Sequence, residues 1–317
     1  MAKDSIQSVT GPIPGVQLGV TLAHEHLWCD ISIQSGRPDN VLQDTAVAAE
    51  ELGEFLRAGG GTVIELTPEG VGRNALKLKV ISETSGARIV SGIAFYDEAT
   101  SPEWALRAGT EEIAAYFVHE IEEGVEGVRA GLIGELYSHN EAQIRPDYRF
   151  TPQEEKVFRA AAAAQKRTGV AISTHAALGR PGVKQLDLLR ESGADLSRVV
   201  IGHCDACLHE DPQRDFEYWL AILEQGAYCQ FDMIGWTELA DDGLRAQRLA
   251  SLVEMGWEKK LLLSTDTCRQ SQLRRNGGRG YGFLLTSFLP RLRALGITEP
   301  QIRSMLVDAP RAALAGG

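Results

Sequence analysis

Eight short apolar segments alternate along the chain with longer segments that have the apolar periodicity of helices. The short segments are nearly continuous runs of Val, Ile, Leu and Ala, a pattern typical of parallel strands that are buried on both faces. They are Gly19–Ala23, Thr62–Leu66, Arg88–Ile93, Ala130–Glu135, Val170–His175, Val199–His203, Ala227–Phe231 and Lys260–Asp266. Eight strands that alternate with helices, without a linker between them, predict an α/β fold. We expect a closed (β/α)8 TIM barrel in which residues 1–317 form a single domain.

The helical segments carry start and stop signals of their own. Thr151-Pro-Gln-Glu154 is a capping box with proline in the first helical position, and its Ala-rich helix is predicted to stop near Gly169. The other predicted helices are Thr45–Ala58, Glu103–Glu123, Gln185–Ser192, Asp215–Glu224, Gly243–Glu254, Leu284–Leu295 and Glu299–Leu306. An open doubly wound sheet is the alternative, but no Gly-x-Gly-x-x-Gly or P-loop motif follows any of the predicted strands.

Charge and composition exclude several classes of partner. The chain has 32 Lys and Arg against 43 Asp and Glu, and the resulting net charge of −11 repels nucleic acid and anionic membrane surfaces. It has no run of 18 apolar residues, no apolar core of a signal peptide at its N-terminus, and an odd number of cysteines, five. We therefore expect a cytoplasmic protein that acts on a small-molecule substrate. The sequence leaves the oligomeric state open, with a homodimer as one alternative.

Six potential metal ligands lie at the ends of five of the predicted strands. His24 and His26 are two residues apart, so on a strand they point the same way while Glu25 points oppositely. The other four are Glu135, His175, His203 and Asp266. Because the carboxyl ends of all barrel strands meet at one face, where active sites are built, we expect the six side chains to converge.

Each of these residues also has a simpler interpretation. A single His is more often a hydrogen-bonded core residue, Glu135 could pair with an Arg, and Asp266 could cap the following turn. Together they favour a centre that holds two divalent metal ions bridged by Glu135. Ligands of N and O suit Zn, with Mn, Co or Fe as alternatives. Two such ions share a hydroxide as nucleophile, and Asp266 is predicted to be both a ligand and the general base.

A competing metal signal overlaps the predicted ligand His203. His203-Cys-Asp-Ala-Cys207-Leu-His209 resembles half of a structural zinc site, but a second Cys/His pair at the expected spacing is missing. Asp205 within it has two interpretations. It is either the partner that accepts the second N–H of a ligating imidazole or an acid of a solvated loop.

Substrate contacts are predicted at two places. The loop after the last strand holds Arg269, Arg274, Arg275 and Arg279, and of these we single out Arg275 for an anionic substrate group, with pairing to surface acids as the alternative. Tyr96 follows the third strand, where its hydroxyl could donate to a substrate oxygen or the ring could pack in the core.

At this point the sequence resembles the phosphotriesterase-related family of the amidohydrolase superfamily, nearly from end to end. The resemblance rests on Gly19-Val-Thr-Leu-Ala-His24-Glu-His26, Ile172-Ser-Thr-His175, Ile201-Gly-His203-Cys-Asp205, Leu263-Ser-Thr-Asp266 and Asn276-Gly-Gly278. It implies a TIM barrel with a binuclear metal centre. It also implies that His24, His26 and Asp266 ligate the more buried ion, and that His175 and His203 ligate the more exposed one.

Two positions depart from the best-known members of the family. Glu135 stands where phosphotriesterases and lactonases have a carboxylated lysine that bridges the ions, as in the phosphotriesterase homology subgroup. Met233 stands where phosphotriesterases have a histidine thought to relay the proton away from the aspartate. We therefore expect hydrolysis of an ester or lactone, in particular an anionic one such as a phosphorylated sugar lactone. Alternatives are phosphotriester or N-acyl amide hydrolysis at the same site and, more remotely, a metal-binding barrel without catalytic activity.

Overall fold

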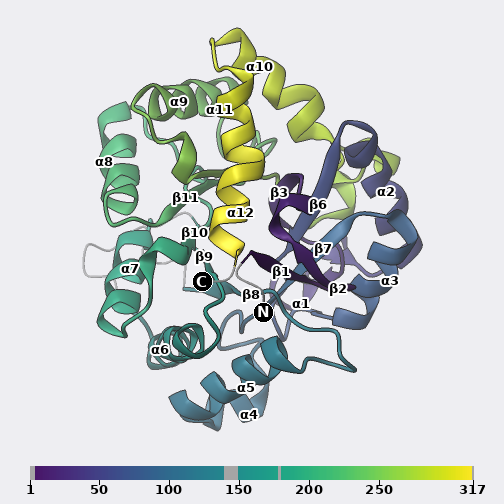
Figure 1. The fold of residues 1–317 in the computed structure, drawn as a ribbon, viewed down its shortest axis with the longest axis vertical. Coiled ribbons are helices and arrows are strands. Elements are labelled where there is room, and N and C mark those ends of the chain that lie inside the picture. The colour runs from purple at the N-terminus through teal and green to yellow at the C-terminus, as the bar shows by residue number, and fades with distance from the viewer. Residues whose placement is uncertain (1–3, 139–148, 178–179, 316–317) are drawn as a thin grey trace.

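Eight parallel strands form one curved sheet in the computed structural model, which describes residues 4–138, 149–177 and 180–315 (Figure 1). They are β3 (Val20–Glu25), β6 (Gly60–Glu65), β7 (Arg88–Ile93), β8 (Leu132–Tyr137), β9 (Ile172–His175), β10 (Val199–Ile201), β11 (Tyr228–Phe231) and β12 (Leu261–Leu263). Their order in the sheet is their order in the chain, and all paired neighbours are parallel. The predicted (β/α)8 barrel is confirmed, and the open doubly wound sheet is wrong because its strand order would reverse at a switch point.

The first and last strands meet just beyond the end of β12. The backbone N–H of Asp266 donates to the carbonyl of His24, and the N–H of His26 donates to the carbonyl of Thr267, both at 3.2 Å. The fully buried Glu25 strengthens this seam. Its carboxylate accepts hydrogen bonds from the hydroxyl groups of Ser264 and Thr265. It also accepts the backbone N–H groups of Thr265 and Thr267, and all four bonds are 2.6–2.8 Å long. The backbone of two predicted ligands is thereby fixed where the barrel closes.

Helices surround the barrel and connect successive strands (Figure 1). They are α1 (Ser32–Ser35), α2 (Thr45–Arg57), α3 (Ala75–Ser85), α4 (Glu103–Arg107), α5 (Thr110–Glu122), α6 (Pro152–Thr168), α7 (Gly182–Glu191), α8 (Pro212–Leu223), α9 (Asp242–Glu254), α10 (Leu289–Ala294), α11 (Glu299–Arg303) and α12 (Ala309–Leu314). The capping box of Thr151 and Glu154 is present, and Gly169 ends α6 in the left-handed conformation. The eight predicted strands and most of the predicted helices are therefore found close to their expected positions.

Three helical predictions differ from the structure. The segment Glu103–Glu123 is two helices, because Glu112 accepts the N–H of Gly109 at 2.7 Å and starts α5 there. The helix α3 was not predicted, and its N-terminus is capped by Asn74, whose side chain accepts the N–H of Lys77 at 3.1 Å. The last predicted helix was expected to end at Leu306, but helical structure continues to Leu314. Pro310 does not stop it, because it lies in the first turn of α12, where a missing N–H costs little.

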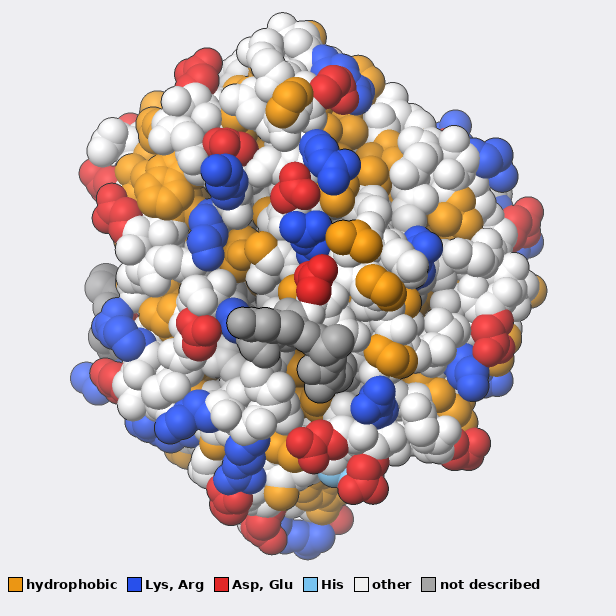
Figure 2. All heavy atoms as spheres, viewed as in Figure 1, with side chains coloured by type: hydrophobic (Ala, Val, Ile, Leu, Met, Phe, Trp, Pro, Cys, Tyr) orange, Lys and Arg blue, Asp and Glu red, His pale blue; other side chains and the backbone are white. Residues whose placement is uncertain are grey.

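A short hairpin of β1 (Ser5–Ser8) and β2 (Gly11–Pro14) lies with α12 at one end of the barrel (Figure 1). Ile6 and Leu18 pack there with Ala313 and Leu314 in a hydrophobic cluster separate from the main core. Acidic and basic side chains are interspersed over this face (Figure 2). The catalytic end of such a barrel is therefore the opposite one, where the strands end. A second short hairpin, β4 (Cys29–Asp30) with β5 (Val41–Leu42), follows the first barrel strand.

Among the described residues, no helix has the length and apolar character needed to cross a membrane.

The seam between β3 and β12 gives a test of barrel closure. Glu25→Ala removes the carboxylate and leaves buried N–H and hydroxyl groups without an acceptor, so we expect the free energy of unfolding to fall by about 3 kcal/mol. Urea unfolding followed by circular dichroism measures this change. Glu83→Ala, an exposed glutamate on α3, is the control. Equal stabilities of the two variants would contradict the role given to Glu25.

Candidate metal centre

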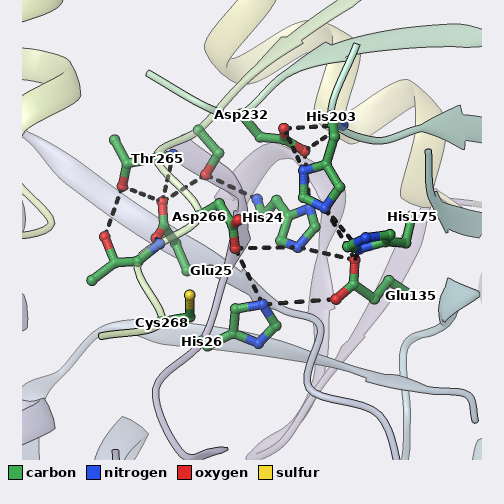
Figure 3. A network of polar contacts seen from close by, with 12 residues as sticks. His24, Glu25, His26, Glu135, His175, His203, Asp232, Thr265, Asp266 and Cys268 are labelled. Atoms are coloured by element: carbon green, nitrogen blue, oxygen red, sulfur yellow. Dashed lines mark hydrogen bonds and ion pairs between the residues drawn. The ribbon is translucent and has the colours of Figure 1, made fainter. Parts of the chain in front are cut away.

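The six predicted ligands converge at the carboxyl end of the barrel (Figure 3). His24 and Glu135 lie within β3 and β8, and His175 is the last residue of β9. His203 and Asp266 were predicted inside strands but follow β10 and β12 by two and three residues. Both have positive φ angles, 55° and 45°, which turn the backbone out of the strand conformation. Such angles are strained for residues other than glycine and are concentrated at functional sites.

Glu135 lies between two groups of histidines. One group is His24, His26 and Glu135, and the other is Glu135, His175 and His203; in each group the potential ligand atoms lie within 4.8 Å of one another. A third such group, His24, His203 and Asp232, does not contain Glu135. Its Oε2 lies 3.0 Å from Nδ1 of His175, 3.4 Å from Nε2 of His203 and 3.5 Å from Nε2 of His24. Its Oε1 lies 3.8 Å from Nε2 of His26. The two groups share one carboxylate, and either could hold a metal ion.

Asp266 extends the first group. Its Oδ1 lies 3.2 Å from Nε2 of His26 and 3.8 Å from Nε2 of His24. Its side chain is 10% exposed, whereas His24 and His26 are at most 4% exposed. The carboxylate therefore reaches the inner histidines from the side that is open to the barrel mouth.

Hydrogen bonds on the far side of the rings fix which nitrogen is protonated. Nδ1 of His24 and Nδ1 of His203 each lie 2.9 Å from a carboxylate oxygen of Asp232, and both must donate because a carboxylate only accepts. Nδ1 of His26 lies 2.9 Å from the hydroxyl of Thr67, which itself donates to Glu65 at 2.5 Å. The Thr67 hydroxyl therefore accepts from His26. In the neutral rings of His24, His26 and His203, Nε2 is left as an unprotonated lone pair that faces Glu135.

This donor set fits a cation. Three lone pairs and the carboxylates of Glu135 and Asp266 face one another, and the buried Nε2 of His24 has no hydrogen-bond partner. Burial lowers the pKa of His26, but Asp266 and Glu135 outweigh it and raise this pKa to about 9. Burial raises the pKa of Glu135, but His175 and His24 hold it well below its usual range. Acceptors packed this closely need protons or metal ions between them, and imidazole and carboxylate are the ligands of zinc and similar ions.

The candidate metal centre opens into a cavity of about 250 Å³. Tyr96 lines it and stacks at 4.5 Å on Tyr137 and at 5.4 Å, edge to face, on His175, so its predicted place near the centre is observed. Burial raises the pKa of Tyr96 well above its usual value, which keeps its hydroxyl protonated. Met233, which the resemblance placed at the position of the proton-relay histidine, also lines the cavity, and its thioether carries no proton.

The four arginines of the last loop do not act together. Arg269 lines the cavity, where it stacks 4.2 Å over Trp236 and pairs with Glu238 at 3.2 Å. Arg279 is tied to the carbonyls of Thr265 and Gly235. Arg274 is 66% exposed, 3.8 Å from Glu54. Arg275, predicted to contact substrate, is exposed and lines a different cavity with Leu27 and Tyr281, so its contact with substrate stays a prediction. The sequence places the charges in one loop but does not show which side chain turns inward.

The cysteines do not form a separate zinc site. Among the described residues, no group of three potential ligands contains a cysteine. Cys204 is buried and its thiol donates to the carbonyl of Ile201 at 3.1 Å.

Three residues of the site were missed. Asp232, Thr67 and Glu65 hold the histidines in place, and Asp232 follows β11 directly, so the same strand-end criterion would have found it. Asp205 had two interpretations, a partner of a ligating imidazole or an acid of a solvated loop, and it is fully buried. It accepts the backbone N–H groups of Asp232 and Met233, at 3.0 and 3.1 Å, and thus lies one step further from the rings.

Comparisons with known proteins agree with the fold and identify the family of the chain. The sequence model of the phosphotriesterase family matches residues 4–314. The phosphotriesterase homology protein of Escherichia coli is 38% identical over 294 residues, which cover 92% of this chain and 96% of that protein. Its crystal structure, a complex with phosphate in the active site, has a TM-score of 0.85 at 36% identity, over 93% of this chain and 98% of that one.

Two further relatives are named for their activities. An N-acetyltaurine hydrolase from Salmo salar is 29% identical over 96% of each chain. The crystal structure of a lactonase from Listeria monocytogenes has a TM-score of 0.86 at 26% identity, over 99% of each chain. The likeness therefore extends over nearly the whole length of each protein.

Metal removal gives a test of the donor set that does not depend on any substrate. Because a ligand that binds only the folded protein stabilises it, Zn²⁺ at 100 times its dissociation constant should stabilise chelator-treated protein by about 2.7 kcal/mol. Thermal unfolding with and without Zn²⁺ measures this shift. We expect it to be lost in Glu135→Ala and kept in His119→Ala, a histidine with a side chain that is 51% exposed on α5. A shift that survives in Glu135→Ala would place the ion elsewhere.

Proposed function

The chain belongs to the phosphotriesterase family and is a hydrolase, and we propose that it binds two divalent metal ions and cleaves an ester or lactone bond. The observation that carries the proposal is the pair of ligand groups that share Glu135. A single carboxylate with one histidine group on each side is the arrangement that a bridged pair of ions requires. Neither group needs a residue from the other, apart from Glu135.

The ligands divide between the ions according to the observed distances. His24, His26 and Asp266 would hold one ion, and His175 and His203 the other, with Glu135 common to both. The set contains N and O atoms and no thiolate, which suits Zn and leaves Mn, Co and Fe as alternatives. When bound, such a pair of ions supplies a water of lowered pKa as nucleophile and polarises the carbonyl that it attacks.

The protein's own side chains would orient the substrate and move the proton. Asp266 lines the cavity and lies 3.2 Å from Nε2 of His26, so it would accept the proton of the nucleophile as general base. Tyr96 keeps its proton and can donate to a substrate oxygen. Met233 cannot take a proton onward from Asp266, so the proton leaves through the cavity. This difference argues against efficient phosphotriester hydrolysis.

An anionic substrate is favoured by the arginine inside the cavity. Arg269 presents a guanidinium at the wall of the cavity that Asp266 and His175 also line, and its stacking on Trp236 limits its motion. The Escherichia coli relative was crystallised with phosphate in its active site. A phosphorylated sugar lactone combines a reactive carbonyl with such an anionic group. We assign the contact to Arg269 because Arg275 lines the other cavity.

N-acyl amide hydrolysis is the second candidate. Several relatives that are 27–29% identical are N-acetyltaurine hydrolases, and N-acetyltaurine also carries an anionic group. Arg269 would serve either substrate, so only kinetics on both classes separates them. The remote alternative from the sequence, a barrel that binds metal without catalysis, is not supported, because the family members and structural neighbours are hydrolases.

Metal content tests the bridged pair directly. Protein purified without added metal should contain about two ions per chain by elemental analysis. Glu135→Ala should contain fewer, because both groups lose the ligand that they share, and its kcat/KM on lactones should fall by more than about 10²-fold. An absence of bound ions in the wild-type protein, even after incubation with Zn²⁺, would refute the proposed centre.

The role of Arg269 is tested by comparing charged and uncharged substrates. Arg269→Ala should lower kcat/KM for a phosphorylated lactone about 10–100-fold more than for the uncharged lactone, since a charge-assisted hydrogen bond contributes about 1.5–3 kcal/mol. Arg275→Ala, in the same loop but outside the cavity, is the matched control and should leave the ratio unchanged. The reverse result would return the anion contact to Arg275.

A further inference from the structure

One buried carboxylate is hydrogen-bonded to a histidine of each ligand group. Asp232 is fully buried directly after β11 and lies behind His24 and His203, on the side away from Glu135 (Figure 3). Its Oδ2 lies 2.9 Å from Nδ1 of His24, and its Oδ1 lies 2.9 Å from Nδ1 of His203. The backbone N–H of His203 donates to it as well, at 3.0 and 3.1 Å. Both oxygens are therefore engaged, each with a different imidazole.

The two imidazoles belong to different ligand groups. His24 is grouped with His26 and Glu135, whereas His203 is grouped with Glu135 and His175. We infer that Asp232 is a positioning residue that fixes the ligating tautomer of one histidine in each group, so that the occupancy of both metal positions depends on this single carboxylate. The inference rests on the proposed binuclear centre and adds to it a residue that holds the two positions in common.

The position of Asp232 is itself fixed by a second set of buried charges. Asp205 accepts the N–H groups of Asp232 and Met233 through Oδ1, and its Oδ2 lies 3.0 Å from Nε of Arg245. Arg245 is fully buried and pairs with Asp242 at 3.0 Å. This chain of contacts holds the backbone of Asp232 in place, so its carboxylate cannot turn toward only one of the two rings.

The number of acceptors makes the inference specific. Both oxygens of a carboxylate accept N–H groups, whereas the amide of asparagine has one acceptor oxygen and an NH₂ group that only donates. In Asp232→Asn, the ring that faces the amide NH₂ must accept with Nδ1. It then carries its proton on Nε2 and has no lone pair there for a metal ion. Either His24 or His203 therefore stops being a ligand, although asparagine has nearly the same size as aspartate.

Titration of the metal-free protein with Zn²⁺, followed by isothermal calorimetry and by elemental analysis after gel filtration, tests this consequence. The wild-type protein should bind about two ions, and Asp232→Asn about one, with the affinity at the altered position at least about 10–100-fold weaker. Asp215→Asn is the matched control, because Asp215 is also fully buried and ion-paired but contacts Arg180 and not a ligand. It should bind about two ions.

The outcomes separate the inference from the proposed function. Two ions with unchanged affinities in Asp232→Asn would overturn the role of Asp232 and leave the binuclear centre intact. An equal loss of ions in Asp232→Asn and Asp215→Asn would also overturn it, because any buried carboxylate would then have the same effect. No ion in the wild-type protein would refute the proposed function itself.

A measurement on the wild-type protein covers the case in which Asp232→Asn does not fold. Long-range ¹H–¹⁵N spectra of histidine-labelled protein report which ring nitrogen carries the proton. We expect Nδ1–H with an unprotonated or metal-bound Nε2 for both His24 and His203. An Nε2–H tautomer at either residue in the metal-loaded protein would overturn the inference.

Discussion

Glu135 is only 2% exposed to solvent, and its carboxylate is surrounded by imidazoles. An isolated charge in such a place would be costly, and the barrel meets this cost by arranging other groups around it. Three strands, β3, β9 and β10, bring four histidines toward it, and buried acceptors on the far side of three rings turn their lone pairs inward. The site is therefore best understood as successive layers of polar groups around one charge. Each layer specifies the orientation of the layer inside it.

These layers also show why a buried polar network is compatible with a stable barrel. Glu25, Glu65, Asp205 and Asp232 are all buried, yet each accepts hydrogen bonds from backbone N–H, hydroxyl, imidazole or guanidinium donors. Because these carboxylates accept hydrogen bonds from such donors, they restrict the conformations of the loops that follow the strands. The loops then hold the side chains of the candidate metal centre in more definite positions than loops without such contacts would.

The sequence predicted the barrel and the six converging side chains because both depend on simple regularities. Buried parallel strands are continuous apolar runs, and their carboxyl ends share one face, so residues such as His175 and Asp266 could be brought together without knowledge of contacts. The helix α3 lacked a clear apolar stripe and was missed. The direction of a side chain within a loop is set by packing, and for this reason Arg275 was favoured where Arg269 lines the cavity. Asp232 directly follows β11, but a single aspartate after a strand carries no metal-ligand pattern, so its role is evident only from its contacts with His24 and His203.

The closure of the barrel has a consequence for the order of events during synthesis. The first histidines belong to the first barrel strand, whereas Asp266 follows the last one, and their backbones pair directly across the seam. A growing chain on the ribosome thus carries His24 and His26 for most of the time of translation without the residue that completes their group. Since non-local contacts of this kind form late, the proposed inner metal position would be assembled only when the whole barrel has been made. Metal binding by His24, His26 and Asp266 would therefore require that the chain is complete and that the barrel is closed.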